Sequence, residues 1–468
     1  HQVHPMIKYL NSYYKILLKL KPNILYLDID SFRADRFYGK TKTSKTPNID
    51  SLLKSSTYFD QTIVSADGTI ISLNSVFTGL FPYATGTRAI KLLFNNKNYI
   101  HLLQEFGYNI YGVIPKLTSL SPLFELCLND NPTYDGGPPT KSLFDEVGQK
   151  IIDVFSTQMK GPWFYYAHIM DLHWPLNVPK QYDDSQFGMD KYDRIVSSID
   201  YWIGKILDNV DLKNTIIIIT ADHGTHIPIN DKNITSFEPK FKTGVKIGKR
   251  LIPTFAHPTI VRLLNFLRKS IRNIKLKQVN KNLSNYEKRS RLPYFTLSLF
   301  DESIRIPLLI AGYNMTSKII SQQIRSLDIF PTIMDMINGP NIENIHGKSL
   351  KHLIDGDESE AFPAYLHTIP YQDLSPQDMV GIRTSKYKYF RGSRNSSHNV
   401  NLYNLQIDPS ENNNIAKNNP QLIKEFETML TNMISNKNKY LENVGDTKGK
   451  DNLKKRISEK KSKLSLKE

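Results

Sequence analysis

Short apolar runs alternate with longer mixed segments along the first 345 residues. Five runs rich in β-branched and aromatic residues have the length of strands: 24–30, 109–114, 163–169, 215–221 and 306–311. The segments between them are long enough for the helical crossovers that parallel strands require. The pattern predicts an α/β fold in which a large, mainly parallel sheet is sandwiched between helices.

The pattern changes from about residue 346 onward. Shorter alternating runs such as Tyr387–Phe390 end at the turn residues Asp408-Pro409-Ser410, which is typical of a small antiparallel sheet. Helical spacing follows, and the last residues are highly charged. We therefore expect three parts: a main domain over 22–345, a smaller C-terminal α+β subdomain over 346–415, and a helical, charged tail over 416–468.

Two of the strand-like runs end abruptly in polar groups. Asp30 closes the first run, and Asp222-His223 follows the run over 215–221. Parallel strands deliver the residues at their carboxyl ends to one edge of the sheet. Carboxylate and imidazole groups are ligands for divalent cations, so these residues suggest a single cation held between the two strands.

A third segment places a hydroxyl group at the start of a helix. Thr69 follows Gly68 and precedes an apolar helical pattern that ends at Thr78-Gly79. A strand-to-helix turn of this kind directs a side-chain oxygen and the free amides of the helix toward an anion.

These segments belong to a longer series of short motifs, each weak alone. In chain order the series is Asp30-Ser31-Phe32-Arg33, Thr46-Pro47-Asn48-Ile49-Asp50, Thr69 to Pro82, His168-x-x-Asp171-x-His173-x-Pro175, Asp222-His223-Gly224, Phe300 to Pro307, Leu327 to Thr332, Arg383-Thr384 and Leu402 to Pro409. Over about 22–415 the chain resembles the sulfatase family of the alkaline phosphatase superfamily. The resemblance implies an alkaline-phosphatase-like mixed sheet with a smaller C-terminal antiparallel subdomain.

The resemblance also assigns roles at the strand ends. It implies that Asp30, Asp222 and His223 are metal ligands and that Thr69 is the nucleophile, its oxygen also contacting the metal. Helix capping is the structural alternative for Asp30 and Thr69. Asp28 shares the face of Asp30 on the strand, and a buried supporting role is favoured for it over a place in the metal shell.

Two further residues are candidates by position. His173 matches the family histidine that contacts the transferred group, and it could donate a proton to the leaving oxygen. His168 or Asp171 could orient it; the alternative for His173 is packing. Lys116 follows Gly107-Tyr108 at nearly the spacing of the family's active-site lysine, with a shift of one residue. The alternative is that Lys116 is a solvated lysine in a loop.

The chain departs from the family at the nucleophile. Formylglycine sulfatases carry Cys or Ser followed by x-Pro-Ser-Arg, whereas this chain has Thr69-Ile-Ile-Ser72-Leu73. Threonine cannot become formylglycine, and the sole cysteine, Cys127, lies elsewhere and allows no disulfide within the chain. A threonine nucleophile is better matched to phosphoryl transfer, where a covalent phospho-intermediate can be hydrolysed or passed to an acceptor. Ser31 stands where the family has a second acid.

The sequence therefore predicts a sulfatase-like hydrolase that cleaves a sulfate or phosphate ester through Thr69, with one divalent ion (Ca, Mg, Mn or Zn). Two alternatives stay open. One is a phosphotransferase or phosphodiesterase acting on lipid head groups or glycans, and the other is a catalytically silent protein that binds anionic glycans.

The net charge of +16 is concentrated in one segment. Residues 240–291 contain fifteen Lys or Arg against the single acid Glu287. A solvated helical insertion is favoured, and an anionic membrane or polyanion surface is the alternative. No nucleic-acid-binding module accompanies the charge, so no nucleic acid is expected.

Residues 1–21 lack a continuous apolar core, and no stretch reaches the roughly 18 apolar residues of a spanning helix. We expect a cytoplasmic protein that binds a sulfated or phosphorylated small molecule, glycan or lipid head group. Peripheral attachment to a membrane stays open.

Overall fold

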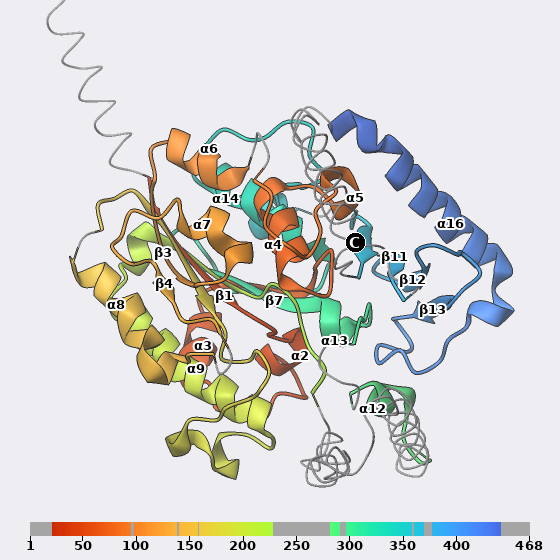
Figure 1. Cartoon of the computed structure of the whole chain (residues 1–468), viewed down its shortest axis with the longest axis horizontal. Coiled ribbons are helices and arrows are strands. Elements are labelled where there is room, and N and C mark those ends of the chain that lie inside the picture. The colour runs from red at the N-terminus through yellow and green to blue at the C-terminus, as the bar shows by residue number, and fades with distance from the viewer. Residues whose placement is uncertain are drawn as a thin grey trace, which may run out of the picture.

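A computed structural model of the chain describes residues 21–94, 98–137, 140–157, 159–227, 281–290, 296–357, 360–368 and 377–440. Most of the basic segment and the end of the charged tail lie outside these residues. Figure 1 shows a large sheet with helices on both sides and a smaller sheet beside it.

The large sheet has nine strands in the order β4-β3-β5-β1-β6-β7-β2-β8, with β9 pairing with β2. All of its pairings are parallel except those of β7, which runs against both β6 and β2. The strands are β1 (Asn23–Ile29), β2 (Thr57–Ile63), β3 (Asn109–Pro115), β4 (Thr133–Tyr134), β5 (Trp163–Ile169), β6 (Thr215–Thr220), β7 (Arg305–Gly312), β8 (Lys318–Ile320) and β9 (Ile324–Arg325). The predicted α/β class is confirmed.

Both faces of this sheet are buried, which is why its central strands read as continuous apolar runs. Alternate residues of β1 enter two separate cores: Leu25 and Leu27 pack with helices α3, α8 and α9, and Ile24 and Tyr26 pack with α4, α6 and α14. The helices are α2 (Ala34–Phe37), α3 (Pro47–Leu53), α4 (Thr69–Thr78), α5 (Pro82–Thr85), α6 (Tyr99–Glu105), α7 (Ser121–Phe124), α8 (Gly148–Thr157), α9 (Lys191–Leu207), α12 (Asn285–Arg289), α13 (Asp301–Ile304), α14 (Ile329–Met336) and α15 (Lys351–Asp355).

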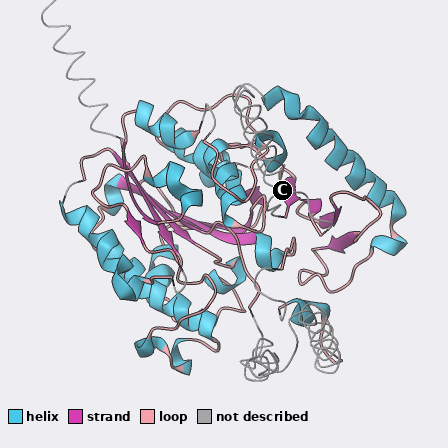
Figure 2. Cartoon of the chain, in the orientation of Figure 1, coloured by secondary structure: helices cyan, strands magenta, loops and turns pink. Residues whose placement is uncertain are grey.

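The smaller sheet is antiparallel, as the sequence predicts. Its order is β10-β11-β12-β13, and Figure 2 shows these strands apart from the large sheet. The strands are β10 (Ala364–His367), β11 (Met379–Arg383), β12 (Tyr387–Gly392) and β13 (Asn401–Asn404), and α16 (Pro420–Ser435) packs on them through Phe426 and Leu430. Within the described residues, no helix is long and apolar enough to cross a membrane.

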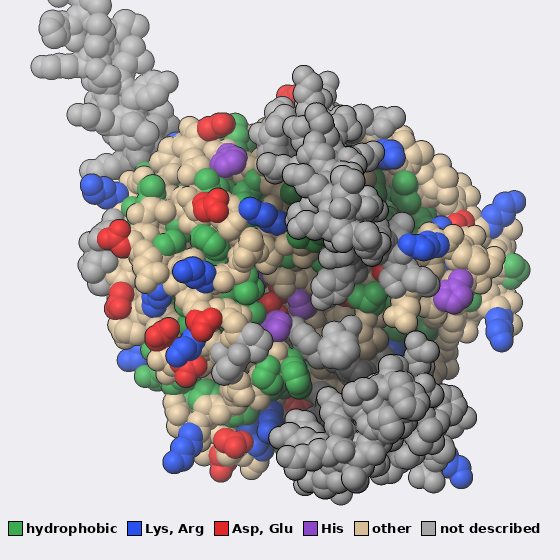
Figure 3. Space-filling model, in the orientation of Figure 1, with side chains coloured by type: hydrophobic (Ala, Val, Ile, Leu, Met, Phe, Trp, Pro, Cys, Tyr) green, Lys and Arg blue, Asp and Glu red, His purple; other side chains and the backbone are tan. Residues whose placement is uncertain are grey.

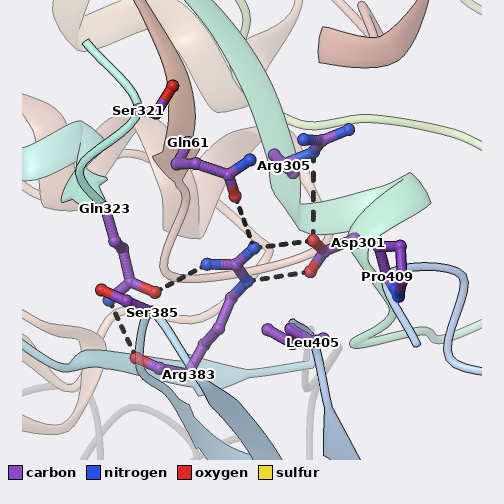
Figure 4. A pocket seen from close by; sticks show the side chains of 9 residues that line it. All are labelled: Gln61, Asp301, Arg305, Ser321, Gln323, Arg383, Ser385, Leu405 and Pro409. Atoms are coloured by element: carbon purple, nitrogen blue, oxygen red, sulfur yellow. Dashed lines mark hydrogen bonds and ion pairs between the residues drawn. The ribbon is translucent and has the colours of Figure 1, made fainter. Parts of the chain in front are cut away.

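Buried ion pairs join the two sheets. Asp301, at the start of α13, accepts hydrogen bonds from Arg383 of β11 (Nη2 to Oδ2, 2.8 Å) and Lys388 of β12 (Nζ to Oδ1, 2.6 Å). Lys388 is fully buried and also lies 2.7 Å from Glu411 Oε1. Figure 4 shows Arg383 between Asp301, Gln61 and Gln323. Because an unpaired buried charge is costly, these pairs hold the sheets in one relative position.

Lys388→Met should lower the free energy of unfolding by about 3–5 kcal/mol, because it leaves two buried carboxylates, Asp301 and Glu411, without their shared cation. Urea denaturation followed by circular dichroism measures the change. Lys386→Met, at an exposed position two residues away, is the control and should stay within about 0.5 kcal/mol of the parent. Equal stability of the two variants would contradict a structural role for this network.

Candidate active site

Three adjacent parallel strands, β5, β1 and β6, bring polar residues to one edge of the large sheet. Asp28 pairs in register with His168 on one side and with Thr220 on the other. Asp30 continues the ladder by donating its amide hydrogen to Ile169 O at 2.9 Å. The strand ends thus bring their polar side chains together, as the sequence predicts for Asp30 and Asp222.

Asp30, His168 and Asp222 form a group that could hold a metal ion. One ligand atom of each lies within 4.8 Å of the others, and all three side chains are buried. Histidine and acidic side chains are also visible side by side near the centre of the face shown in Figure 3.

His223 adds a second imidazole to this group. Its Nδ1 lies 2.7 Å from Gly224 O. A carbonyl only accepts, so Nδ1 carries a hydrogen, and Nε2 is the ring nitrogen that faces the cluster. Nε2 lies 3.6 Å from Asp222 Oδ2 and 3.3 Å from Thr69 Oγ1. Gly224 is needed here, since a Cβ would lie 2.2 Å from Glu302 O.

Thr69 is the first residue of α4, directly after the N-cap residue Gly68. Its Oγ1 lies 3.4 Å from Asp30 Oδ2 as well as 3.3 Å from His223 Nε2, so the hydroxyl is directed at the cluster. The first intrahelical hydrogen bond is Ser72 N to Gly68 O. The amides of residues 69–71 therefore have no helical acceptor, and they give the helix start a positive character.

The acids of the cluster are short of compensating partners. Asp222 Oδ2 and Asp28 Oδ1 are buried and accept no hydrogen bond. Burial, and then the nearby charge of Asp30, raises the pKa of Asp222 to about 6. Burial opposes ionisation of Asp30 too, but its contact with His168 and the neighbouring histidines hold the pKa of Asp30 well below its usual range. Buried carboxylates that repel one another fit a site for a cation.

Ser31 occupies the position where the family has a second acid, and it supports the first. It adopts a left-handed backbone with φ +64°. Its hydroxyl donates to Asp30 Oδ1 at 2.6 Å, and its amide donates to Asp222 Oδ1 at 3.3 Å. These bonds hold the two carboxylates in fixed orientations.

The other predicted residues follow the parallel strands β3 and β5 at the same edge of the sheet. His173 follows β5 and is partly buried, near enough that its charge lowers the pKa of Asp30. Asp171 is buried and accepts the amide hydrogen of Leu143 (Leu143 N to Oδ1, 3.2 Å), and burial raises its pKa to about 7. Lys116, just after β3, has an exposed side chain.

Sequence reasoning gave His168 only a supporting place beside His173, yet His168 lies inside the acidic cluster. Its Nε2 is 3.6 Å from Asp30 Oδ2, and its Nδ1 is 3.4 Å from Asp28 Oδ2. The signal was available in the sequence: His168 stands at the carboxyl end of a predicted strand, as Asp30 and Asp222 do.

Family models match most of the chain. A sulfatase model matches residues 22–339, and an N-sulphoglucosamine sulphohydrolase C-terminal model matches residues 294–439. The chain therefore belongs to the sulfatase family, and the predicted resemblance is confirmed.

Two curated relatives share parts of the sequence. Arylsulfatase K of Danio rerio is 26% identical to this chain in the matched region. That region covers 30% of this chain and 28% of the length of arylsulfatase K. An ulvan-active sulfatase of Formosa agariphila is 23% identical over 91% of this chain and 82% of its own length.

Solved structures share the fold at lower identity. One, determined with its substrate D-glucosamine-2-N,6-O-disulfate, has a TM-score of 0.61 at 17% identity and covers 92% of this chain and 100% of that chain. The phosphonate monoester hydrolase of Agrobacterium radiobacter has a TM-score of 0.59 at 15% identity and covers 89% and 96%. The fold thus accompanies both sulfur and phosphorus ester chemistry, and it does not decide between them.

Asp222→Asn should abolish stabilisation by a divalent cation without lowering the thermal midpoint of the metal-free protein. The substitution removes a buried charge that repels Asp30, and it also removes a ligand. A cation present at 100 times its Kd raises the free energy of unfolding of the parent protein by about 2.7 kcal/mol.

Thermal unfolding with chelator and with titrated cations measures both effects. Asp355→Asn, at an exposed carboxylate, is the control and should keep the full cation response. An undiminished response in Asp222→Asn would remove Asp222 from the site.

Proposed function

We propose that this protein is a metal-dependent sulfuric ester hydrolase that uses Thr69 as its nucleophile and acts on sulfated saccharides. The observation that carries the proposal is the position of the Thr69 hydroxyl. It lies at the start of α4, within 3.4 Å of a buried carboxylate and within 3.3 Å of an imidazole nitrogen. The names of the relatives, which include an ulvan-active sulfatase, support a sulfated glycan as the substrate class.

The cation would be held by Asp30, Asp222 and His223. When bound, a divalent ion lowers the pKa of a nearby hydroxyl and neutralises charge on the transferred group. Two buried carboxylate oxygens here, Asp28 Oδ1 and Asp222 Oδ2, accept no hydrogen bond, which supports the assignment.

Thr69 would attack the sulfur of the ester, forming a bond from Oγ1 to sulfur while the bond from sulfur to the sugar oxygen breaks. The Thr69 proton has an acceptor within reach, Asp30 Oδ2 at 3.4 Å from Oγ1, because His223 Nε2 would be engaged by the cation. The free amides of residues 69–71 would hold the oxygens of the transferred group. Water then attacks the sulfur of the Thr69 ester, releasing sulfate and restoring the hydroxyl.

His173 would give a proton to the departing sugar oxygen. It stands four residues after the end of β5, and its charge contributes to lowering the pKa of Asp30. This influence on Asp30 supports the assignment.

Transfer of a phosphoryl group through the same threonine is the second candidate. The absence of a modifiable residue at position 69 favours it, because a threonine sulfate can be resolved only by attack of water on sulfur, whereas phosphothreonine-type intermediates form readily in phosphoryl transfer. Paired substrates that differ only in the ester separate the two candidates.

Thr69→Ala should lower kcat on the preferred ester about a thousandfold or more, because no other hydroxyl occupies that position. Thr69→Ser should keep measurable activity. Aryl sulfate, aryl phosphate and aryl phosphodiester hydrolysis, measured with Mg, Ca, Mn or Zn restored, gives the rates. Ser72→Ala, one turn further along α4 and buried, is the control. Full activity of Thr69→Ala would exclude Thr69 as the nucleophile.

His173→Gln should slow esters with poor leaving groups far more than esters with good ones. Loss of a general acid costs about 100- to 10,000-fold when the departing oxygen needs a proton. Nitrophenolate departs without taking up a proton, so a nitrophenyl ester serves as the internal control. The kcat values for a nitrophenyl ester and a sugar ester, compared in the variant and the parent, test this role. An equal loss on both esters would point instead to positioning of the substrate.

A further inference from the structure

We infer that His168 is a ligand of the cation together with Asp30, Asp222 and His223, and that this set of donors selects a transition-metal ion over calcium or magnesium. This inference deepens the proposed function. It rests on the proposed function in one respect, the presence of one cation at this site. It names a residue for which the family resemblance assigned no ligand role.

The position of His168 is the first support. β5 lies beside β1 in the sheet, and His168 is in register with Asp28. Its side chain is only 1% exposed. A ligand atom of His168 lies within 4.8 Å of ligand atoms of both Asp30 and Asp222. The imidazole therefore occupies the buried space between the carboxylates.

The orientation of the ring is the second support. Tyr166 OH donates to Asp28 Oδ2 at 2.6 Å, so its oxygen is free to accept from His168 Nδ1 at 3.0 Å. Asp28 Oδ2 itself lies 3.4 Å from Nδ1. With its hydrogen on Nδ1, the ring turns Nε2 toward Asp30, 3.6 Å from Oδ2. A metal-bound histidine characteristically donates its other ring N–H to a carboxylate or another acceptor in this way.

The missing acid at position 31 is the third support. Ser31 directs its hydroxyl at Asp30 Oδ1, where it acts as a donor to a ligand. One anionic oxygen donor of the family pattern is thus absent from the turn that follows β1. His168 supplies a neutral nitrogen donor from the neighbouring strand.

The chemistry of the donors leads to the class of metal. Calcium and magnesium prefer shells of oxygen atoms. Two imidazole nitrogens, from His168 and His223, with two carboxylates suit zinc, manganese or other first-row transition ions. The exchange of an acid for a histidine also lowers the negative charge of the shell, which weakens the attraction for calcium.

X-ray absorption of the full-length protein loaded with zinc or cobalt tests the inference without any variant. We expect the scattering signature of two imidazoles on each metal ion. A signature of one imidazole, or of oxygen donors alone, would overturn it. The result does not depend on turnover, so the inference and the proposed ester chemistry can fail separately.

Cobalt binding to variants gives a second test. Visible absorption reports the ligand field, and competition with a coloured chelator gives affinity. His168→Ala should weaken cobalt binding more than 100-fold and change the visible bands, and Asp28→Asn should weaken it about 10- to 100-fold, as expected when a group that orients a ligand is lost.

The relative affinity of the site for different metal ions gives a third test. The parent should bind cobalt, zinc or manganese at least 100-fold more tightly than calcium, and His168→Asp should narrow that ratio by restoring an oxygen donor. His398→Asn, which removes an exposed imidazole, is the control and should behave as the parent. Unchanged cobalt affinity and bands in folded His168→Ala would instead assign His168 to a salt bridge between Asp28 and Asp30.

Discussion

Repulsion between buried carboxylates at the ends of β1 and β6 is the constraint on which the site depends. Asp28, Asp30 and Asp222 are buried on adjacent strands, where their charges cannot be screened by water. His168 and His223 turn ring nitrogens toward these acids. The negative charge fits a bound cation, and the two central strands hold the acids together even though the acids raise the energy of the metal-free fold.

The rest of the molecule fixes this cluster from several sides. Helix α4 presents Thr69 to it, and the close approach of Gly224 to Glu302 ties the end of β6 to the motif that begins at Phe300. The adjoining residue Asp301 joins that motif to Arg383 and Lys388 of the smaller sheet. The second sheet is thus coupled through buried ion pairs to the segment that contacts the Asp-His-Gly turn.

Sequence patterns predicted the parts of the fold that are governed by continuous burial. The runs that form β1, β3, β5, β6 and β7 are apolar on both faces, so they are readable without a structure. β2 was not predicted, because its register shifts between Phe59 and Thr62 and the polar Asp60-Gln61 pair interrupts the alternation. The antiparallel direction of β7 likewise depends on its neighbours in space.

The candidate site shows a similar division. Asp30, Thr69, Asp222 and His223 could be chosen from strand ends and a helix start, and the structure brings them together. The place of His168 depends on the order of strands in the sheet, since it meets Asp28 and Asp30 only because β5 lies next to β1. Asp28, one partner of Nδ1, follows from the same adjacency. The other partner, Tyr166, precedes His168 by two residues on β5 and so shares its face of the strand.

The central claim is that the Thr69 hydroxyl becomes covalently bound to the transferred group. Rapid-quench peptide mass spectrometry during a single turnover of the preferred ester tests it most directly. The account predicts a sulfated, or for the second candidate a phosphorylated, peptide containing Thr69 that forms as the alcohol is released and then decays. Release of the alcohol with no adduct on Thr69 at any time would contradict it.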